Sequence, residues 1–279
     1  ILCQKVENLV AGAPCGIMDQ ITVAFGRKNA LLPILCRAPS KNPPRLRRGV
    51  REAVVLGRPL PLPPGLSFIG LDSGKGHRGA GADYGTVRAA AFMGRRILGL
   101  KGPLAGIEPS LFESRLAPRL PRTLFGHDFL RRFKTHSDPV TQVDPSKSYP
   151  VLAATRHPVW ENHRVRLFMD LLKAYSPSRG EEALRLMGEL MFQSHASYSS
   201  CGLGSPATDL IVEKARRLGP KHGIYGAKIT GGGSGGTVAL LVKGSPQRAL
   251  KALDPSGRRT RFIGSSPGAL DTPPLSGLL

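Results

Sequence analysis

Two short segments of this chain combine residue types and spacing that suit chemistry on a bound ligand. The first is GAPCGIMDQ, Gly12 to Gln20, in which glycines and a proline precede a single carboxylate, Asp19. Such a loop costs conformational entropy, so it usually serves a geometric purpose. Two interpretations are open from these residues alone. Asp19 either caps a helix after a tight turn, or the loop presents the Asp19 carboxylate to a ligand.

The second segment is the glycine run GGGSGG, Gly231 to Gly236. Its glycines formally satisfy the G-x-G-x-x-G spacing of dinucleotide-binding folds, which require a strand before the loop and a helix after it. The residues that follow, TVALLV, predict a strand instead, so we exclude dinucleotide binding. Two possibilities remain: a loop without side chains whose N–H groups close on an anion, or a flexible hairpin connection.

Composition limits the classes of protein to which this chain can belong. Its 279 residues can bury the core of one large domain or of two modest ones. No apolar run approaches the roughly 18 residues that span a membrane, so we expect no membrane partner. The cysteines are widely spaced and form no C-x-x-C pair, which argues against a zinc site or a disulfide framework. This pattern favours a reducing compartment, and we expect a cytoplasmic protein without a metal site of its own.

The chain is strongly basic, with 40 Lys and Arg against 19 Asp and Glu and a net charge of +21. Such a balance points to a polyanion as a partner. The excess is concentrated in proline-interrupted segments with few aromatic residues for base stacking, at 41–65, 115–134 and 255–262. We therefore expect solvated insertions, and we do not expect nucleic acid as a partner.

The elements that must position the two segments are predicted from periodicity and from end signals. A strand over Leu66–Asp72 leads through a glycine-rich turn into a helix over Tyr84–Leu98, and a strand over Thr237–Val242 follows the glycine run. Ser205 is predicted to cap a helix that ends at Gly219. The chain opens on an amphipathic helix without an initiator methionine, so we expect a fragment that lacks upstream residues. Further helices are expected over 161–175 and 180–198.

Several segments, taken in order, resemble the galactokinase-like branch of the GHMP small-molecule kinases, and most of all the plant L-arabinokinases. They are ENLVAGAPCGIMDQ, DSGKGHRGAGADYGTVR, RHPVWENHRV, GELMFQSHASYSSCGLGS and YGAKITGGGSGGTVAL, and DPVTQVDPSKSYPV adds to the resemblance. The resemblance implies an α+β fold of two lobes with the active site between them. Residues 1–82 would be the remainder of an incomplete N-terminal lobe, and residues 83–279 the C-terminal lobe.

The resemblance also implies an ATP-dependent sugar-1-kinase, in which the γ-phosphate passes to the anomeric hydroxyl of L-arabinose or galactose with Mg²⁺ as cofactor. Asp19 would act as general base or stabilise the attacking oxygen, Gly16 would leave room for the sugar ring, and Tyr84 would hydrogen-bond the sugar. The third motif of the family would shape the phosphate region. It comprises Gly231, Gly232, Gly233, Ser234, Gly235 and Gly236.

The first and second motifs of the family, which grip the sugar and cradle the ATP phosphates, have no counterpart in this chain. We therefore expect the chain alone to lack kinase activity, and to be prone to aggregation because apolar surface is left exposed. Two alternatives stay open. One is a non-catalytic relative that binds sugar and nucleotide as a sensor, and the other is a polyanion-binding protein.

Other polar residues have smaller expected roles. His77 matches one half of an Arg-His pair in the family, but Gly76 precedes it, so the role of that pair is in doubt here. Structural roles are expected for the rest: a polar cluster of Arg156, His157 and Glu161, a satisfied core histidine, His195, and a carboxylate that favours a helix dipole, Asp209.

Overall fold

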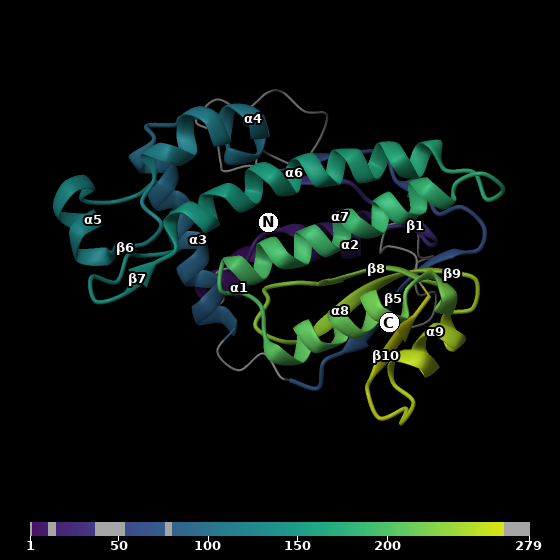
Figure 1. Ribbon diagram of the computed structural model, residues 1–279. Coiled ribbons are helices and arrows are strands. Elements are labelled where there is room, and N and C mark those ends of the chain that lie inside the picture. The colour runs from purple at the N-terminus through teal and green to yellow at the C-terminus, as the bar shows by residue number, and fades with distance from the viewer. Residues whose placement is uncertain (1, 11–14, 37–53, 76–79, 265–279) are drawn as a thin grey trace, which may run out of the picture.

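A four-stranded antiparallel sheet forms the centre of one half of the molecule (Figure 1). The computed structural model describes residues 2–10, 15–36, 54–75 and 80–264 of the chain, and these form an α+β fold, as predicted. The strand order is β10-β5-β9-β8. The bounds are β5 (Leu66–Asp72), β8 (Ile224–Ile229), β9 (Thr237–Lys243) and β10 (Arg261–Ile263), which confirms the strands predicted at 66–72 and 237–242.

The strand order crosses the predicted lobe boundary. β5 lies before residue 82, yet it pairs with β9 along its whole length and with β10 on its other side. The division into 1–82 and 83–279 therefore stays a prediction, with the sheet drawing strands from both parts of the chain.

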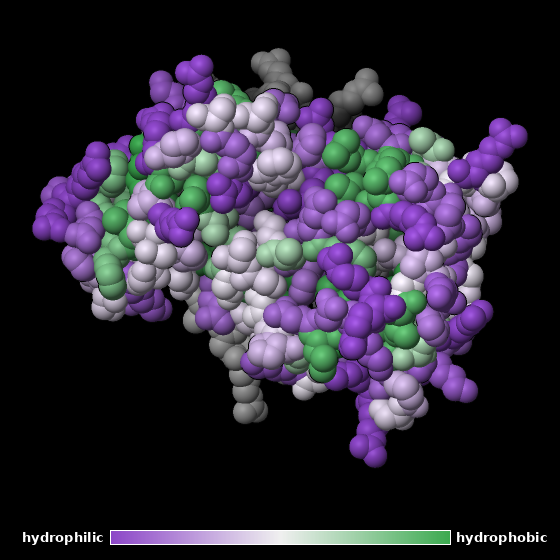
Figure 2. Space-filling model, in the orientation of Figure 1, coloured by the Kyte–Doolittle hydropathy of each residue, from purple (hydrophilic) through white to green (hydrophobic). Residues whose placement is uncertain are grey.

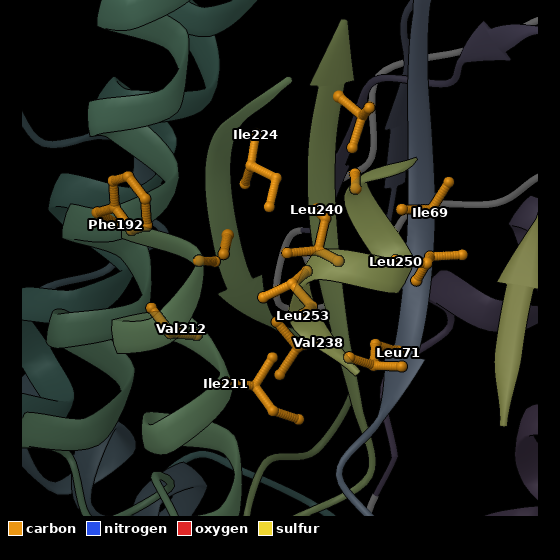
Figure 3. Close-up of a cluster of buried hydrophobic side chains, with 14 residues drawn as sticks. Ile69, Leu71, Phe192, Ile211, Val212, Ile224, Val238, Leu240, Leu250 and Leu253 are labelled. Atoms are coloured by element: carbon orange, nitrogen blue, oxygen red, sulfur yellow. The ribbon is translucent and has the colours of Figure 1, made fainter. Parts of the chain in front are cut away.

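Alternating apolar residues place the sheet between two layers of helices. Ile69 of β5 pairs with Leu240 of β9, and both point toward α8 (Pro206–Leu218) and α9 (Pro246–Leu253), as Figure 3 shows. Leu241 points to the opposite face, where it packs with Met187 and Met191 of α7 (Glu181–Ser200). This period of two is what a sheet buried on both faces requires.

The helix α6 (Val151–Ala174) connects this half of the molecule to a second hydrophobic core. It begins ten residues before the predicted start and runs through Pro158, because its first half buries Val151, Ala154 and Val159 against α3 (Ala80–Ile97). That packing outweighs the cost of a proline inside a helix. Within the described part of the chain, neither α6 nor any other helix has the length and apolarity to cross a membrane.

Segment 115–134 is not the solvated insertion that the sequence predicted. It contributes Ala117, Leu120 and Phe129 to the second core, and Phe129 has no exposed surface. Its arginines and lysine lie on the outside, and Figure 2 shows mostly hydrophilic side chains along the outer rim of this end of the molecule. The last two residues of segment 255–262 belong to β10. Residues 41–53 of the remaining basic segment lie outside the described residues.

The remaining elements are short and lie mainly in the first half of the chain. The opening helix α1 (Leu2–Leu9) is present as predicted, but its apolar side chains Leu2 and Leu9 are largely exposed. The others are α2 (Met18–Phe25), α4 (Pro109–Leu111), α5 (Gly126–Phe133), β1 (Ala30–Leu31) with β4 (Leu60–Pro61), β2 (Ile34–Cys36) with β3 (Val54–Leu56), β6 (Leu124–Phe125) with β7 (Ser148–Tyr149), and short 3₁₀ or π turns at 104–106, 112–119 and 220–222.

Local end signals set the bounds of α8 as predicted. Ser205 accepts a hydrogen bond from the Thr208 N–H, and the Thr208 hydroxyl faces back to the Ser205 N–H, which together form a capping box. Pro206 occupies the first turn and Gly219 ends the helix with a φ of 56°. The bounds of α3 were predicted less well, since the helix begins at Ala80 and not at Tyr84.

A buried polar cluster joins α6, α7 and β8. Glu161 accepts hydrogen bonds from Lys228 Nζ at 3.0 Å, Ser194 Oγ at 2.6 Å and Arg164 Nε at 2.9 Å. Burial alone would raise the pKa of Glu161, but Lys228 and the other nearby positive charges bring it to about 2. Burial lowers the pKa of His157 to about 4, even though the Glu161 carboxylate opposes this.

The predicted cluster of Arg156, His157 and Glu161 is wrong in one member. Arg156 donates to Glu113 through two nitrogens, at 2.8 and 2.9 Å, on a different side of α6. Residues 157 and 161 are four apart and share a face, whereas residue 156 lies about 100° round the helix from residue 157.

The contact between α7 and β8 generates a first prediction. A Cβ at Gly188 would stand 1.8 Å from the Tyr225 carbonyl oxygen, and Gly226 is the facing residue. We expect Gly188→Ala to lower the free energy of unfolding by about 1–3 kcal/mol, as overpacking does, in urea denaturation followed by circular dichroism. Gly102→Ala is the control, because a Cβ there meets no atom within 4 Å. Equal effects of the two changes would refute this close packing.

The low pKa of His157 generates a second prediction. Because its folded-state pKa of about 4 lies below the ordinary 6.5, the unfolded chain binds more protons between these values. Stability should therefore fall as the pH falls from 7 to 5. We expect His157→Gln to make this slope of unfolding free energy against pH shallower. His127→Gln, which removes a 58% exposed side chain, is the control. An unchanged slope in His157→Gln would contradict the prediction.

Candidate functional site

The glycine run forms a loop between β8 and β9 whose backbone needs glycine at most positions. Positive φ angles occur at Gly231 (66°), Gly233 (83°), Ser234 (58°), Gly235 (139°) and Gly236 (74°). Space is also restricted, because a Cβ at Gly233 would stand 2.5 Å from the Leu203 carbonyl oxygen. A side chain is therefore excluded at Gly233 by conformation and by packing, and it is disfavoured by conformation at Gly231, Gly235 and Gly236.

Hydrogen bonds hold this loop in place at both ends. The Ser234 N–H donates to the Leu203 carbonyl at 2.7 Å, and the Gly236 N–H donates to the Lys75 carbonyl at 3.1 Å. The Ser73 N–H donates in turn to the Gly236 carbonyl at 2.8 Å. These bonds describe a fixed loop and argue against a flexible hairpin connection.

Several N–H groups of the loop stay available to a ligand. Those of Gly231, Gly232, Gly233 and Gly235 have no hydrogen-bond acceptor within the described part of the chain. Successive N–H groups in a loop of mainly positive φ can converge on an anion. The loop thus has the composition and the backbone geometry for a phosphate or a carboxylate.

The start of α3 lies directly against the loop. A Cβ at Gly232 would stand 4.0 Å from the Cβ of Tyr84, and Ser234 Oγ donates to Asp83 Oδ2 at 2.9 Å. On the other side, the Tyr198 hydroxyl donates to the Gly231 carbonyl at 2.8 Å. The structure therefore brings the predicted Tyr84 and the glycine loop together.

Burial controls the protonation of the two tyrosines. It raises the pKa of Tyr84, while Arg88 acts in the opposite direction and the Cys36 and Cys15 thiols add to the rise. Burial likewise raises the pKa of Tyr198 far above its usual range. Both phenols are protonated near neutral pH, so each has a hydroxyl proton to donate.

Asp19 lies in the first turn of α2 and is exposed to solvent. It does not cap the helix, since the N-cap is Ile17 and no side chain makes a capping hydrogen bond there. The capping interpretation of this segment is therefore wrong. Ile17 and Ile21 are buried beneath the helix and anchor it, so the carboxylate is held at a fixed point of the surface.

Cys15, in the loop before Asp19, lies within electrostatic range of Tyr84, but no hydrogen bond joins the two within the described residues. Cys15 donates to Glu7 of α1 at 2.7 Å, and burial together with Glu7 raises the pKa of the thiol to about 11. Within the described residues, no hydrogen bond or ion pair joins the Asp19 carboxylate itself to Tyr84 or to the loop.

Of the other predicted residues, His195 and Asp209 lie where expected. The His195 ring is buried, with Nε2 3.1 Å from Asp209 Oδ1 and Nδ1 accepting from the Ile229 N–H at 3.4 Å. Its hydrogen bonds are satisfied, and burial lowers its pKa. Asp209 lies in the first turn of α8, as predicted. His77 lies outside the described residues.

Sequence analysis missed two residues that flank Tyr84: Tyr198 and Arg88. Arg88 is four positions after Tyr84 and so shares its face of α3, which is a signal that the sequence contains. Tyr198 comes from α7 and has no local signal, because its partner Gly231 is 33 residues away. In the described parts of the chain, no three His, Cys, Asp or Glu residues gather in a group that could hold a metal ion.

The chain is similar to known proteins in sequence and in fold. Residues 171–257 match the family described as GHMP kinases C terminal. The chain is 36% identical to an L-arabinokinase from Arabidopsis thaliana, and 31% identical to a galactokinase from Chloroflexus aggregans. A galactokinase from Lactococcus lactis, solved in complex with galactose, shares the fold with a TM-score of 0.60 at 18% identity, over 96% of this chain and 58% of that one.

These matches cover nearly all of this chain but only part of each relative. The match to L-arabinokinase covers 96% of the chain and 29% of that protein, and the match to the Chloroflexus galactokinase covers 87% and 50%. Residues 171–257 therefore correspond to the C-terminal domain of the GHMP kinases, and the chain is a homologue of L-arabinokinase and galactokinase that spans half of their length or less.

Proposed function

We propose that this chain forms part of a sugar-1-kinase, which transfers the γ-phosphate of ATP to the anomeric hydroxyl of a monosaccharide, L-arabinose or galactose. The observation that carries the proposal is the convergence of separate segments around Tyr84. The glycine loop is bonded to the start of α3 through Ser234 and Asp83, and Cys15 of the loop before Asp19 lies within electrostatic range of Tyr84. These are the segments on which the resemblance to the family rests.

The surroundings of Gly16 leave room for a ligand at this site. A Cβ at Gly16 would meet no described atom within 4 Å, and its φ lies outside the left-handed region. Neither the backbone nor the packing of the described residues therefore requires glycine at this position. The described residues leave open space beside Gly16, and we assign that space to the sugar ring.

Asp19 would accept the proton of the anomeric hydroxyl as the sugar oxygen bonds to the γ-phosphorus and the bond from phosphorus to the ADP oxygen breaks. A positioned base of this kind contributes about 10²–10⁴-fold to the rate. The N-terminal end of α2 favours a negative charge at this position. Most of the remaining acceleration in phosphoryl transfer comes from positioning and charge stabilisation.

The other groups would bind and orient the substrates. Tyr84 would donate its hydroxyl proton to an oxygen of the sugar, and the loop N–H groups of Gly232 and Gly235 would face phosphate oxygens. Mg²⁺, when bound, would neutralise phosphate charge. It usually keeps several waters and binds through phosphates with only one or two carboxylates, so the lack of a three-residue cluster among the described residues does not conflict with its use.

The experiment that tests this function uses the complete gene product with ATP, Mg²⁺ and either sugar. We expect formation of the sugar 1-phosphate, identified by phosphorus NMR, with L-arabinose as the better substrate because the similarity to L-arabinokinase is the stronger. Phosphate on another hydroxyl, or no transfer to either sugar, would refute the proposal.

The role of Asp19 generates a third prediction. We expect Asp19→Asn to lower kcat by about 10²–10⁴-fold while sugar affinity, measured by calorimetry, changes little. Asp128→Asn is the control, since Asp128 also lies in the first turn of an eight-residue helix, α5. Unaltered transfer in Asp19→Asn would refute the role of Asp19, whereas the lack of any transfer in the unmodified protein would favour the non-catalytic sensor.

A further inference from the structure

Arg88 of α3 and Asp138 form a two-point ion pair behind Tyr84. Arg88 Nε donates to Asp138 Oδ2 at 2.7 Å, and Nη2 donates to Oδ1 at 2.9 Å. The Asp138 side chain has no exposed surface, and that of Arg88 is 20% exposed. Bidentate pairs of this kind fix the plane of the guanidinium as well as its position.

Asp138 is itself held by its own loop. Its carboxylate accepts from the Thr141 hydroxyl at 2.6 Å and from the N–H groups of Thr141 and Val140. The Asp138 N–H donates to His136 Nδ1 at 3.2 Å. Burial would raise the pKa of Asp138, but the bonds from Arg88 and Thr141 lower it, so the carboxylate is ionised near neutral pH.

Arg88 and Tyr84 share a face of α3, because they are one helical turn apart. The guanidinium charge lies near enough to the Tyr84 hydroxyl to lower the pKa of the phenol, against the effect of burial. The Arg88 guanidinium also lies 5.7 Å from the centre of the Phe92 ring, which limits its movement on the other side. Asp138 is thus bonded to Arg88, which lies one turn from Tyr84, and the start of α3 is bonded to the glycine loop through Asp83 and Ser234.

We propose that Asp138 is a positioning residue for the sugar pocket: through Arg88 it fixes the Tyr84 hydroxyl at the point from which it donates to the sugar. This proposal rests on the proposed function. It assigns a role to the segment DPVTQVDPSKSYPV, whose first residue is Asp138. A binding group is effective only where its own orientation is fixed by surrounding contacts, and a phenol on an otherwise free side chain would not meet that condition.

A double-mutant cycle tests the proposal. In the complete gene product we expect Asp138→Asn to raise the KM for the sugar about 10-fold and to leave the KM for ATP unchanged. In a Tyr84→Phe background, which lacks the hydroxyl, Asp138→Asn should have no further effect on the KM for the sugar. A residue that only stabilises the fold would act equally in both backgrounds, and that result would overturn the proposal.

Matched variants protect the test against loss of folding. Glu113→Gln is the control. It breaks another two-point ion pair, between Glu113 and Arg156, and no hydrogen bond joins either residue to Tyr84 in the described part of the chain. It should leave both KM values unchanged. If Asp138→Asn does not fold, Arg88→Lys replaces it in the cycle with the same expected result. Lysine keeps the positive charge but cannot make the two parallel hydrogen bonds of a guanidinium.

The outcomes separate the two proposals. If Tyr84→Phe weakens sugar binding and neither Asp138→Asn nor Arg88→Lys does, the positioning role is refuted and the proposed function stands. If the unmodified protein phosphorylates neither sugar, the proposed function fails and the positioning role fails with it.

Discussion

The close approach of the glycine loop to the start of α3 is the contact on which the candidate site depends. It depends on Gly233, which has no side chain, and on a run of positive φ angles that most other residues avoid. With a Cβ at Gly233 the loop would collide with Leu203, and the hydrogen bond from Ser234 to the Leu203 carbonyl would be lost. Tyr198 bonds to the backbone of this loop, and Asp83 accepts from the hydroxyl of Ser234.

The two buried carboxylates behind this surface each have several hydrogen-bond donors. Glu161 has three donors, and Asp138 has Arg88 together with donors from its own loop. A buried charge without such partners would be costly. Satisfied in this way, the two carboxylates tie α6, α7 and β8 on one side, and α3 on the other, to the elements that carry the site.

Sequence analysis predicted the features that depend on neighbouring residues. The strands β5 and β9 and both ends of α8 follow from alternation, from Ser205 and from Gly219, which are all local signals. Packing between distant segments was not predictable in the same way. The start of α6 ahead of Pro158 depends on burial against α3, and the pair of Arg88 with Asp138 joins residues 50 apart. The candidate site follows the same division, since the glycine loop was predicted and its neighbour Tyr198 was not.

The strong positive charge has a simple relation to this interior. Two carboxylates inside the fold are paired with cations. Asp138 pairs with Arg88, and Glu161 pairs with Arg164 and Lys228. The excess arginines of segment 115–134 lie on the surface, while the apolar residues between them, such as Phe129, supply the second core. A basic surface segment can thus be a structural part of the fold without a polyanion as its partner. In segment 115–134 the excess positive charge thus lies on the solvent side of the molecule, while the charges of Asp138 and Glu161 are balanced locally.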